Sequence, residues 1–142
     1  MIRAVQCLQR VALALLMLVA MTAGAQDPQA NAAQKAARDF MAMTDRGDAA
    51  GSWAKAGAQF RRALSAQAWS DALKRARPPL GDMIRRTLEK SEFTRSAPNM
   101  PDGDYAVLVF RSSFVKKSEA LERVTLERES DGDWHVIGYF IQ

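Results

Sequence analysis

Apolar residues recur at helical spacing along residues 28–46. The positions that lie three, four and seven apart are Ala33, Ala36, Ala37, Phe40, Met41 and Thr44. A stripe of this kind predicts a helix that buries one face. Asp27 can cap the first turn and Pro28 suits the first helical position, so we expect the helix to begin there.

Two further helices are predicted before residue 77. Gly47 can end the first helix and Asp48 can cap a short second one, which Gly57 interrupts before its apolar face continues. Ser65 can cap a third helix, and two consecutive prolines stop it. We therefore expect three helices over residues 28–77. The aromatic residues expected in their core are Trp53, Phe60 and Trp69.

The second half of the chain changes to the two-residue period of β-strands. Four strands are predicted, over about 83–95, 105–114, 121–129 and 134–141. Asp131-Gly132 marks a hairpin turn before the last strand, and Gly138 can mark a bulge within it. We expect one face of that strand to hold Trp134, Val136 and Phe140, and the other to hold His135, Ile137, Tyr139 and Ile141.

The order of these elements predicts an α+β fold. Helices and strands are segregated along the chain, and the connections between strands are short. The sheet should therefore be antiparallel, with the helices on one face. We expect three N-terminal helices packed on a curved four-stranded antiparallel sheet, in a single domain over residues 26–142.

The N-terminal segment has the three parts of a secretory signal peptide. Arg3 and Arg10 precede or border an apolar run over residues 11–20, and small residues follow at Ala23-Gly24-Ala25. Even extended to Ala25 the run is only about 22 Å of helix, which is short for about 30 Å of hydrocarbon. We expect cleavage between Ala25 and Gln26, and a periplasmic or secreted domain. An uncleaved segment, which would tether the protein to the membrane, is the alternative.

Composition changes this picture in two ways. Loss of residues 1–25 removes Arg3 and Arg10 and lowers the formal charge from +4 to +2, so a nucleic-acid partner is not expected. The single cysteine, Cys7, lies in the same segment, so residues 26–142 can form neither a disulfide nor a cysteine metal site. With one histidine in the chain, we expect no metal and no cofactor.

Motifs that could support catalysis are sparse. Ser52-x-x-Lys55 matches a nucleophile motif of penicillin-binding enzymes, but the other elements of those enzymes are missing. Arg77, just before the prolines, can tie helix-end carbonyls or a carboxylate such as Glu119 or Glu122. No catalytic residue is assigned. The candidate ligand-binding residues are Arg77, Arg86, Tyr105, His135 and Tyr139, with a small anion as one ligand class.

A set of segments spread over residues 35–141 resembles the DUF4019 family. They are Trp53, Phe60, Trp69, Arg77-x-Pro79-Leu80-Gly81, Asp102-Gly103-Asp104-Tyr105, Phe114, Glu119, Val124-Thr125-Leu126 and Asp131-Gly132-x-Trp134-x-Val136-x-Gly138-Tyr139-Phe140. The resemblance implies an exported bacterial domain without an assigned activity. The order of elements also resembles the NTF2-like and cystatin-like rolls, whose curved sheet wraps a long helix. Folds of that shape host enzymes and binding modules alike.

Three functional hypotheses follow from the sequence. The favoured one is a non-enzymatic module that binds a small ligand or an envelope protein, or pairs with a second copy through the sheet. The second is a small pocket enzyme, an isomerase or hydrolase, using His135, Asp104 or Tyr139 with Arg77 or Arg86. The third is the membrane-tethered envelope protein.

Overall fold

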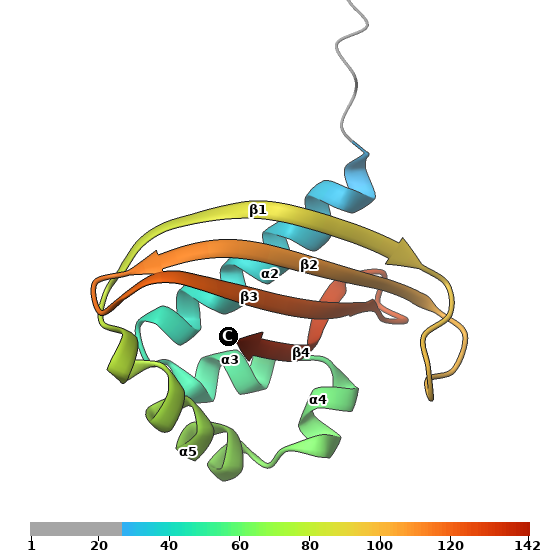
Figure 1. Cartoon of the computed structure of the whole chain (residues 1–142). Helices are drawn as coiled ribbons and strands as arrows, with labels where there is room; N and C mark the ends of the chain where they lie inside the picture. The colour runs from blue at the N-terminus through green and yellow to red at the C-terminus, as the bar shows by residue number, and fades with distance from the viewer. Residues whose placement is uncertain (1–26) are drawn as a thin grey trace, which may run out of the picture.

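The computed structural model describes residues 27–142 and has the predicted α+β architecture (Figure 1). Helices come first and an antiparallel sheet follows. The elements are α2 (Pro28–Asp45), α3 (Ala49–Lys55), α4 (Ala58–Ala63), α5 (Ala66–Ala76), the 3-10 helix η1 (Pro78–Leu80), β1 (Met83–Thr94), β2 (Asp104–Phe114), β3 (Lys117–Arg128) and β4 (Trp134–Ile141). The expected signal peptide and its cleavage site, Ala25 and Gln26, lie outside the described residues.

The long helix α2 begins and ends as its sequence predicts. The Asp27 side chain accepts a hydrogen bond from the Gln29 amide at 2.9 Å, and Pro28 occupies the first turn. Gly47 follows the helix with a φ of 74°, a left-handed conformation that glycine adopts without strain. No helix of the described part is long and apolar enough to cross a membrane.

The expectation of three helices was wrong, because four α-helices precede the sheet within residues 27–142. Gly57 separates α3 from α4, with an extended φ of −66° and ψ of 161°. Its amide donates to the carbonyl of Val136 on β4 at 2.8 Å. The chain therefore leaves the helical conformation at Gly57 to contact the sheet, and α4 starts as a separate helix.

The four strands lie in sequence order in one antiparallel sheet, β1-β2-β3-β4. The sheet curves over α2 (Figure 1). Three strands match their predicted ranges to within one residue, but β3 begins four residues early, at Lys117, because the β2–β3 turn is shorter than expected. β1 forms one edge, and its pairing with β2 shifts register between Met83 and Arg85 and between Leu88 and Lys90.

A bulge in β4 corrects the predicted faces of that strand. Val136 pairs with Leu126, whereas Gly138 pairs with Thr125, so one extra residue lies between them. Beyond the bulge, each side chain lies on the opposite face of the sheet from the one that regular alternation would give it. Tyr139 therefore points toward the helices, whereas Phe140 is 63% exposed on the outer face, the reverse of the expectation.

Aromatic side chains form the centre of the core. Phe40 of α2 contacts Phe60, Trp69 and Tyr139, with ring centroids 5.6–6.0 Å apart. Phe60 and Trp69 are buried and Trp53 packs partly buried against them, as the sequence predicts. This cluster fixes the helices against the sheet and places Tyr139 beside the polar residues described next.

Candidate functional site

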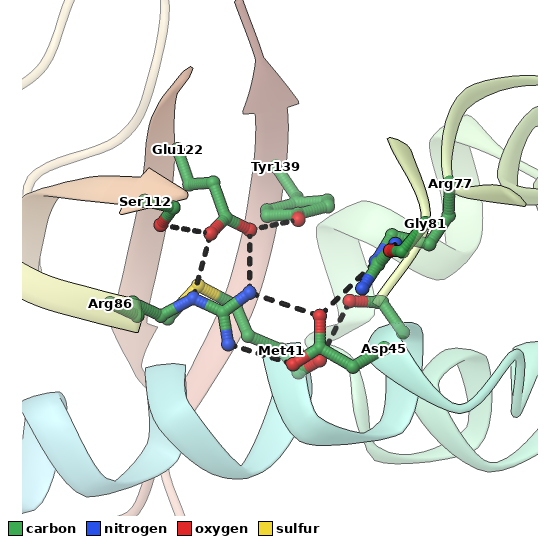
Figure 2. A network of polar contacts seen from close by, with 9 residues as sticks. Met41, Asp45, Arg77, Gly81, Arg86, Ser112, Glu122 and Tyr139 are labelled. Carbon is green, nitrogen blue, oxygen red and sulfur yellow. Dashed lines mark hydrogen bonds and ion pairs between the residues drawn. The ribbon is translucent and has the colours of Figure 1, made fainter. Parts of the chain in front are cut away.

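Three of the five predicted ligand-binding residues, Arg77, Arg86 and Tyr139, lie in one polar network inside the domain (Figure 2). The network extends from the C-terminal end of α2 to the inward faces of β1, β2, β3 and β4. It also contains Asp45, Ser112 and Glu122, which the sequence does not identify as site residues.

Arg86 is the centre of the network and binds two carboxylates. Its Nε donates to Glu122 Oε1 at 2.7 Å and its Nη2 to Glu122 Oε2 at 3.1 Å. Nη1 and Nη2 also donate to the two carboxylate oxygens of Asp45, at 2.8 and 3.0 Å. Burial alone would lower the pKa of Arg86, but the bonds to Asp45 and Glu122 outweigh it and raise that pKa well above its ordinary value.

Glu122 is fully buried and accepts hydrogen bonds on both oxygens. Besides those from Arg86, the Ser112 hydroxyl donates to Oε1 at 2.5 Å and the Tyr139 hydroxyl donates to Oε2. Burial, followed by the neighbouring charge of Glu122, raises the pKa of Tyr139, so the phenol keeps its proton and remains a donor. The carboxylate thus has a complete set of partners within the protein.

Arg77 joins the network from the other side of Asp45. Its Nε donates to Asp45 Oδ1 at 3.2 Å, and its Nη1 donates to the Gly81 carbonyl at 2.5 Å. The helix-end role predicted for Arg77 is present, but the predicted carboxylate partners, Glu119 and Glu122, were wrong. The ends of α2 and α5 meet, so Asp45 is the nearer acid, and Arg86 already occupies Glu122.

The network is balanced in charge, and both of its carboxylates have hydrogen-bond partners. Two guanidiniums face two carboxylates, and the described residues contain no fully buried side-chain nitrogen or oxygen without a partner. Such a set keeps its polar groups engaged with one another, which stabilises a particular packing of helices on sheet. It offers no unpaired buried carboxylate as a general base.

His135 lies apart from this network, between α3 and the β3–β4 turn. Its Nε2 is 2.7 Å from Asp131 Oδ2, and its Nδ1 is 3.4 Å from the Lys55 carbonyl. Burial lowers the pKa of His135, but the bonds to Asp131 and to Lys55 outweigh it and raise that pKa above its ordinary value. The protonated ring can donate to both partners, which the neutral ring cannot.

His135 lines an open groove of about 690 Å³. The groove lies between α2 and the β3–β4 hairpin, and the end of α3 and Arg61 of α4 complete its lining. Apolar lining residues include Ala32, Ala36, Ala54, Ala56, Phe40, Met43, Trp134 and Val136. Its charged residues are Lys35, Asp39, Lys55, Arg61, Glu129, Asp131 and Asp133. A site of this size with an apolar lining and a few polar groups suits a small ligand.

Most of these charges are already engaged. Lys35 pairs with Asp39 at 2.6 Å, the Arg61 guanidinium donates to the Ala54 carbonyl, and Glu129 accepts from a backbone amide. Within residues 27–142 the side chains of Lys55 and Asp133 have neither an ion pair nor a hydrogen bond. Lys55 and Asp133 thus give the groove a cation and an anion without any partner among the described residues, whereas Arg61 and Glu129 are engaged only by backbone hydrogen bonds.

Tyr105 contributes to the fold rather than to either group. Its side chain is buried, and its hydroxyl donates to the Pro101 carbonyl at 2.7 Å, which ties the β1–β2 connection to β2. Burial raises the pKa of Tyr105, so its hydroxyl stays protonated as a donor. The structure does not bring Tyr105 together with the other four candidate residues.

The Ser52-x-x-Lys55 motif has a structural role. Ser52 is buried, and its hydroxyl donates to the Asp48 carbonyl at 2.8 Å while accepting from the Trp69 indole at 2.9 Å. Lys55 lies on the exposed end of α3. Separately, no group of three His, Cys, Asp or Glu side chains in the described part of the chain could hold a metal ion.

The network residues that were missed do leave a signal in the sequence. Ser112 and Glu122 each interrupt a row of inward-facing apolar positions, such as Ala120, Val124 and Leu126 around Glu122. A charge in such a row predicts a buried partner of opposite sign. An interrupted row of apolar positions therefore identifies the buried polar residue, although it does not identify the side chain that pairs with it.

Comparisons with known proteins agree with this architecture. The family profile described as "Protein of unknown function (DUF4019)" matches residues 36–139, so the chain belongs to the DUF4019 family. No curated protein matches it.

Two solved structures show the same NTF2-like fold at low sequence identity. One, from Catenulispora acidiphila, has a TM-score of 0.51 and 15% identity over 79% of this chain and 88% of its own. The other, Aln2 from a Streptomyces species, has a TM-score of 0.50 and 16% identity over 82% of this chain and 91% of its own. At this identity the likeness concerns the fold, and the function has to be argued from the site.

Proposed function

We propose that this DUF4019 domain is an exported, non-enzymatic binding module whose ligand occupies the groove beside His135. The observation that carries the proposal is the contrast between the two polar sites. In the buried network Arg86 and both carboxylates are paired with one another, whereas the groove is open and leaves Lys55 and Asp133 available. A ligand can bind to side chains that are available in this way. Catalysis by the network would need an unpaired acid or base, and its carboxylates are paired.

The charges of the groove define the class of ligand. Acidic and basic side chains are nearly equal in number along it, so a simple anion gains little there. A small zwitterion with an apolar body matches better. Lys55 would bind its negative group, Asp133 its positive group, and the alanines of α2 would contact its apolar part.

Filling the groove provides the test. The protein is purified from the periplasm of producing cells, and its native and denatured masses are compared for the wild type, Ala32→Trp and Ala68→Trp. Both alanines are exposed and helical, but only Ala32 lines the groove. A non-covalent mass that persists in Ala68→Trp and disappears in Ala32→Trp supports the proposal.

Because a weak ligand can dissociate during purification, the same proteins are also titrated with the low-molecular-mass fraction of a periplasmic extract. The readout is the amide and indole signals of Trp134 in nuclear magnetic resonance spectra. Perturbation of these signals that Ala32→Trp prevents is expected. If neither the extra mass nor the perturbation occurs, the groove is not a ligand site.

The denatured mass also tests export and the two alternatives. A chain beginning at Gln26 in the soluble periplasmic fraction is expected, whereas a mass that includes residues 1–25 in the membrane fraction would favour the tethered protein. Turnover of an extract component that is lost in His135→Gln would favour the pocket enzyme and overturn the non-enzymatic assignment.

A further inference from the structure

A second hollow, of about 310 Å³, is lined by Asp45 but not by Arg86. It is lined by the end of α2, by α5 and by η1 with the turn that follows it. Its polar side chains are Asp45, Arg46, Ser70, Lys74, Arg77 and Asp82. None of them lines the groove beside His135.

Arg77 is the buried cation of this hollow, since only 5% of its surface is exposed. Figure 2 shows its guanidinium beside Asp45 and Gly81. Nε and Nη1 make the bonds to those two residues, and the Phe114 ring lies 4.5 Å from Cζ. This set of contacts fixes the orientation of the planar group.

The third nitrogen of that guanidinium, Nη2, makes no hydrogen bond with any residue of 27–142. Since the described residues contain no fully buried polar side-chain atom without a partner, Nη2 must retain access to solvent. Arg77 lines the hollow, so the two N–H groups of Nη2 are donors that a ligand there could reach.

The side chains that line the hollow carry one more positive than negative formal charge, from Arg46, Lys74 and Arg77 against Asp45 and Asp82. Asp45 already accepts three hydrogen bonds from two guanidiniums, so its charge is largely compensated. Lys74 belongs to none of the ion pairs formed within residues 27–142. Asp82 is the one lining acid without such compensation, and it is exposed.

We propose that this hollow binds a small oxyanion, a carboxylate or phosphate group, through Arg77 Nη2, Lys74 and the Ser70 hydroxyl. Arginine forks and lysine ammonium groups are the side chains that bind such groups most strongly. The volume admits a small organic acid or phosphate ester and is too small for a large ligand. The anionic class expected from the sequence is thus assigned to Arg77 and not to Arg86 or His135.

The test is a titration of the domain with sodium phosphate and, separately, with sodium succinate, at ionic strength held constant with sodium chloride. The readouts are the amide signals of Gly47 and Gly81 and the side-chain Nε signal of Arg77. Saturable shifts of these signals with at least one anion are expected, and the stronger anion identifies the preferred group. If neither produces a saturable shift at tens of millimolar, the proposal is wrong.

Two neighbouring residues of α5 give a matched pair of variants. Lys74→Gln and Arg75→Gln remove the same charge from adjacent exposed positions, but only Lys74 lines the hollow. Lys74→Gln should weaken binding about tenfold, because a charge-assisted bond is lost, and Arg75→Gln should change it by less than about twofold. Equal weakening by both would show general screening of charge and would overturn the site.

A substitution at Arg77 itself needs a separate measure of folding. Arg77→Lys keeps the charge but removes the fork, and its native fold is checked by circular dichroism and by its thermal midpoint. A folded Arg77→Lys protein that binds either anion as tightly as the wild type would contradict the role given to Nη2. Failure of this site leaves the groove beside His135 untouched, since the two sites share no residue.

Discussion

Arg86 and Glu122 belong to strands that are not neighbours, yet their side chains meet at 2.7 Å. Arg86 lies on β1 opposite Ser112 of β2, and Ser112 itself donates to Glu122 on β3. The ion pair therefore spans the intervening strand on its helix-facing side. It links the edge strand β1 to the centre of the sheet without direct pairing of the backbones.

The first prediction concerns this pair. Glu122→Gln keeps the size of the side chain but leaves the buried Arg86 with one carboxylate instead of two. Breaking a buried ion pair on one side costs about 3–5 kcal/mol. Urea unfolding should show a loss of this size. Glu119→Gln, at an exposed position of the same strand, is the control and should stay within about 0.5 kcal/mol of the wild type. A similar small change in Glu122→Gln would contradict the assigned network.

The second prediction is a pH dependence of stability through His135. Its folded-state pKa lies above the ordinary value of about 6.5, so protonation favours the folded protein. The stability advantage of the wild type over His135→Gln should be complete below about pH 6.5 and should disappear as the pH rises through the folded-state pKa. Urea unfolding at a series of pH values measures it.

Asp131→Asn is the partner variant for this series. It removes the carboxylate that bonds to His135 Nε2, so the pH-dependent advantage should shrink in that background. A difference between wild type and His135→Gln that is constant across the series would show that the histidine acts by packing alone.

The third prediction compares two glycines near β4. A methyl group at Gly57 would lie 2.6 Å from Glu129 Oε1 and 2.7 Å from Ile137 Cγ2, whereas one at Gly138 would meet Thr125 at 3.5 Å. Gly57→Ala should therefore cost about 1–3 kcal/mol, the usual cost of overpacking. Gly138→Ala should cost less than about 0.5 kcal/mol, because the new contact is an ordinary one. Thermal and urea unfolding of both variants would test the contrast, and equal costs would refute it.

The fourth prediction tests the role of Ser52. Ser52→Ala removes the acceptor of the buried Trp69 indole and should cost about 1–3 kcal/mol of stability. Trp69→Phe in the Ser52→Ala background should cost less than it does in the wild type, since the unsatisfied donor is then absent. An additive double-mutant cycle would mean that the hydrogen bond contributes nothing.

The local elements could be predicted from the sequence because their causes are local. Asp27, Pro28 and Gly47 define α2 through capping and backbone preference, and the strands follow from their period. The separation of α3 from α4 was only partly visible, since Gly57 leaves the helix to bond with Val136, which lies in the last strand of the chain. Two residues so far apart in the sequence leave no local sequence pattern from which their contact could be predicted.

The site was less predictable for the same reason. Arg77, Arg86 and Tyr139 were recognised as chemically capable, but their partner Asp45 lies at a helix end, where an acid has many ordinary roles. The inward direction of Tyr139 depends on the β4 bulge, and a shift by one residue reverses every face beyond it. The sequence therefore identified the polar side chains of Arg77, Arg86 and Tyr139, but it did not show that they pair with buried carboxylates.

The edge strand β1 determines whether two molecules of this protein can associate by pairing their strands. It spans 12 residues, and its exposed side presents backbone groups that another strand could pair with. Two register shifts interrupt that row, and Arg85, Glu89, Lys90 and Glu92 place charges of both signs along it. A second strand could match only short stretches of such an edge and would have to bury those charges. The domain thus resists growth into sheet-extended fibres, even though β1 is a long edge strand.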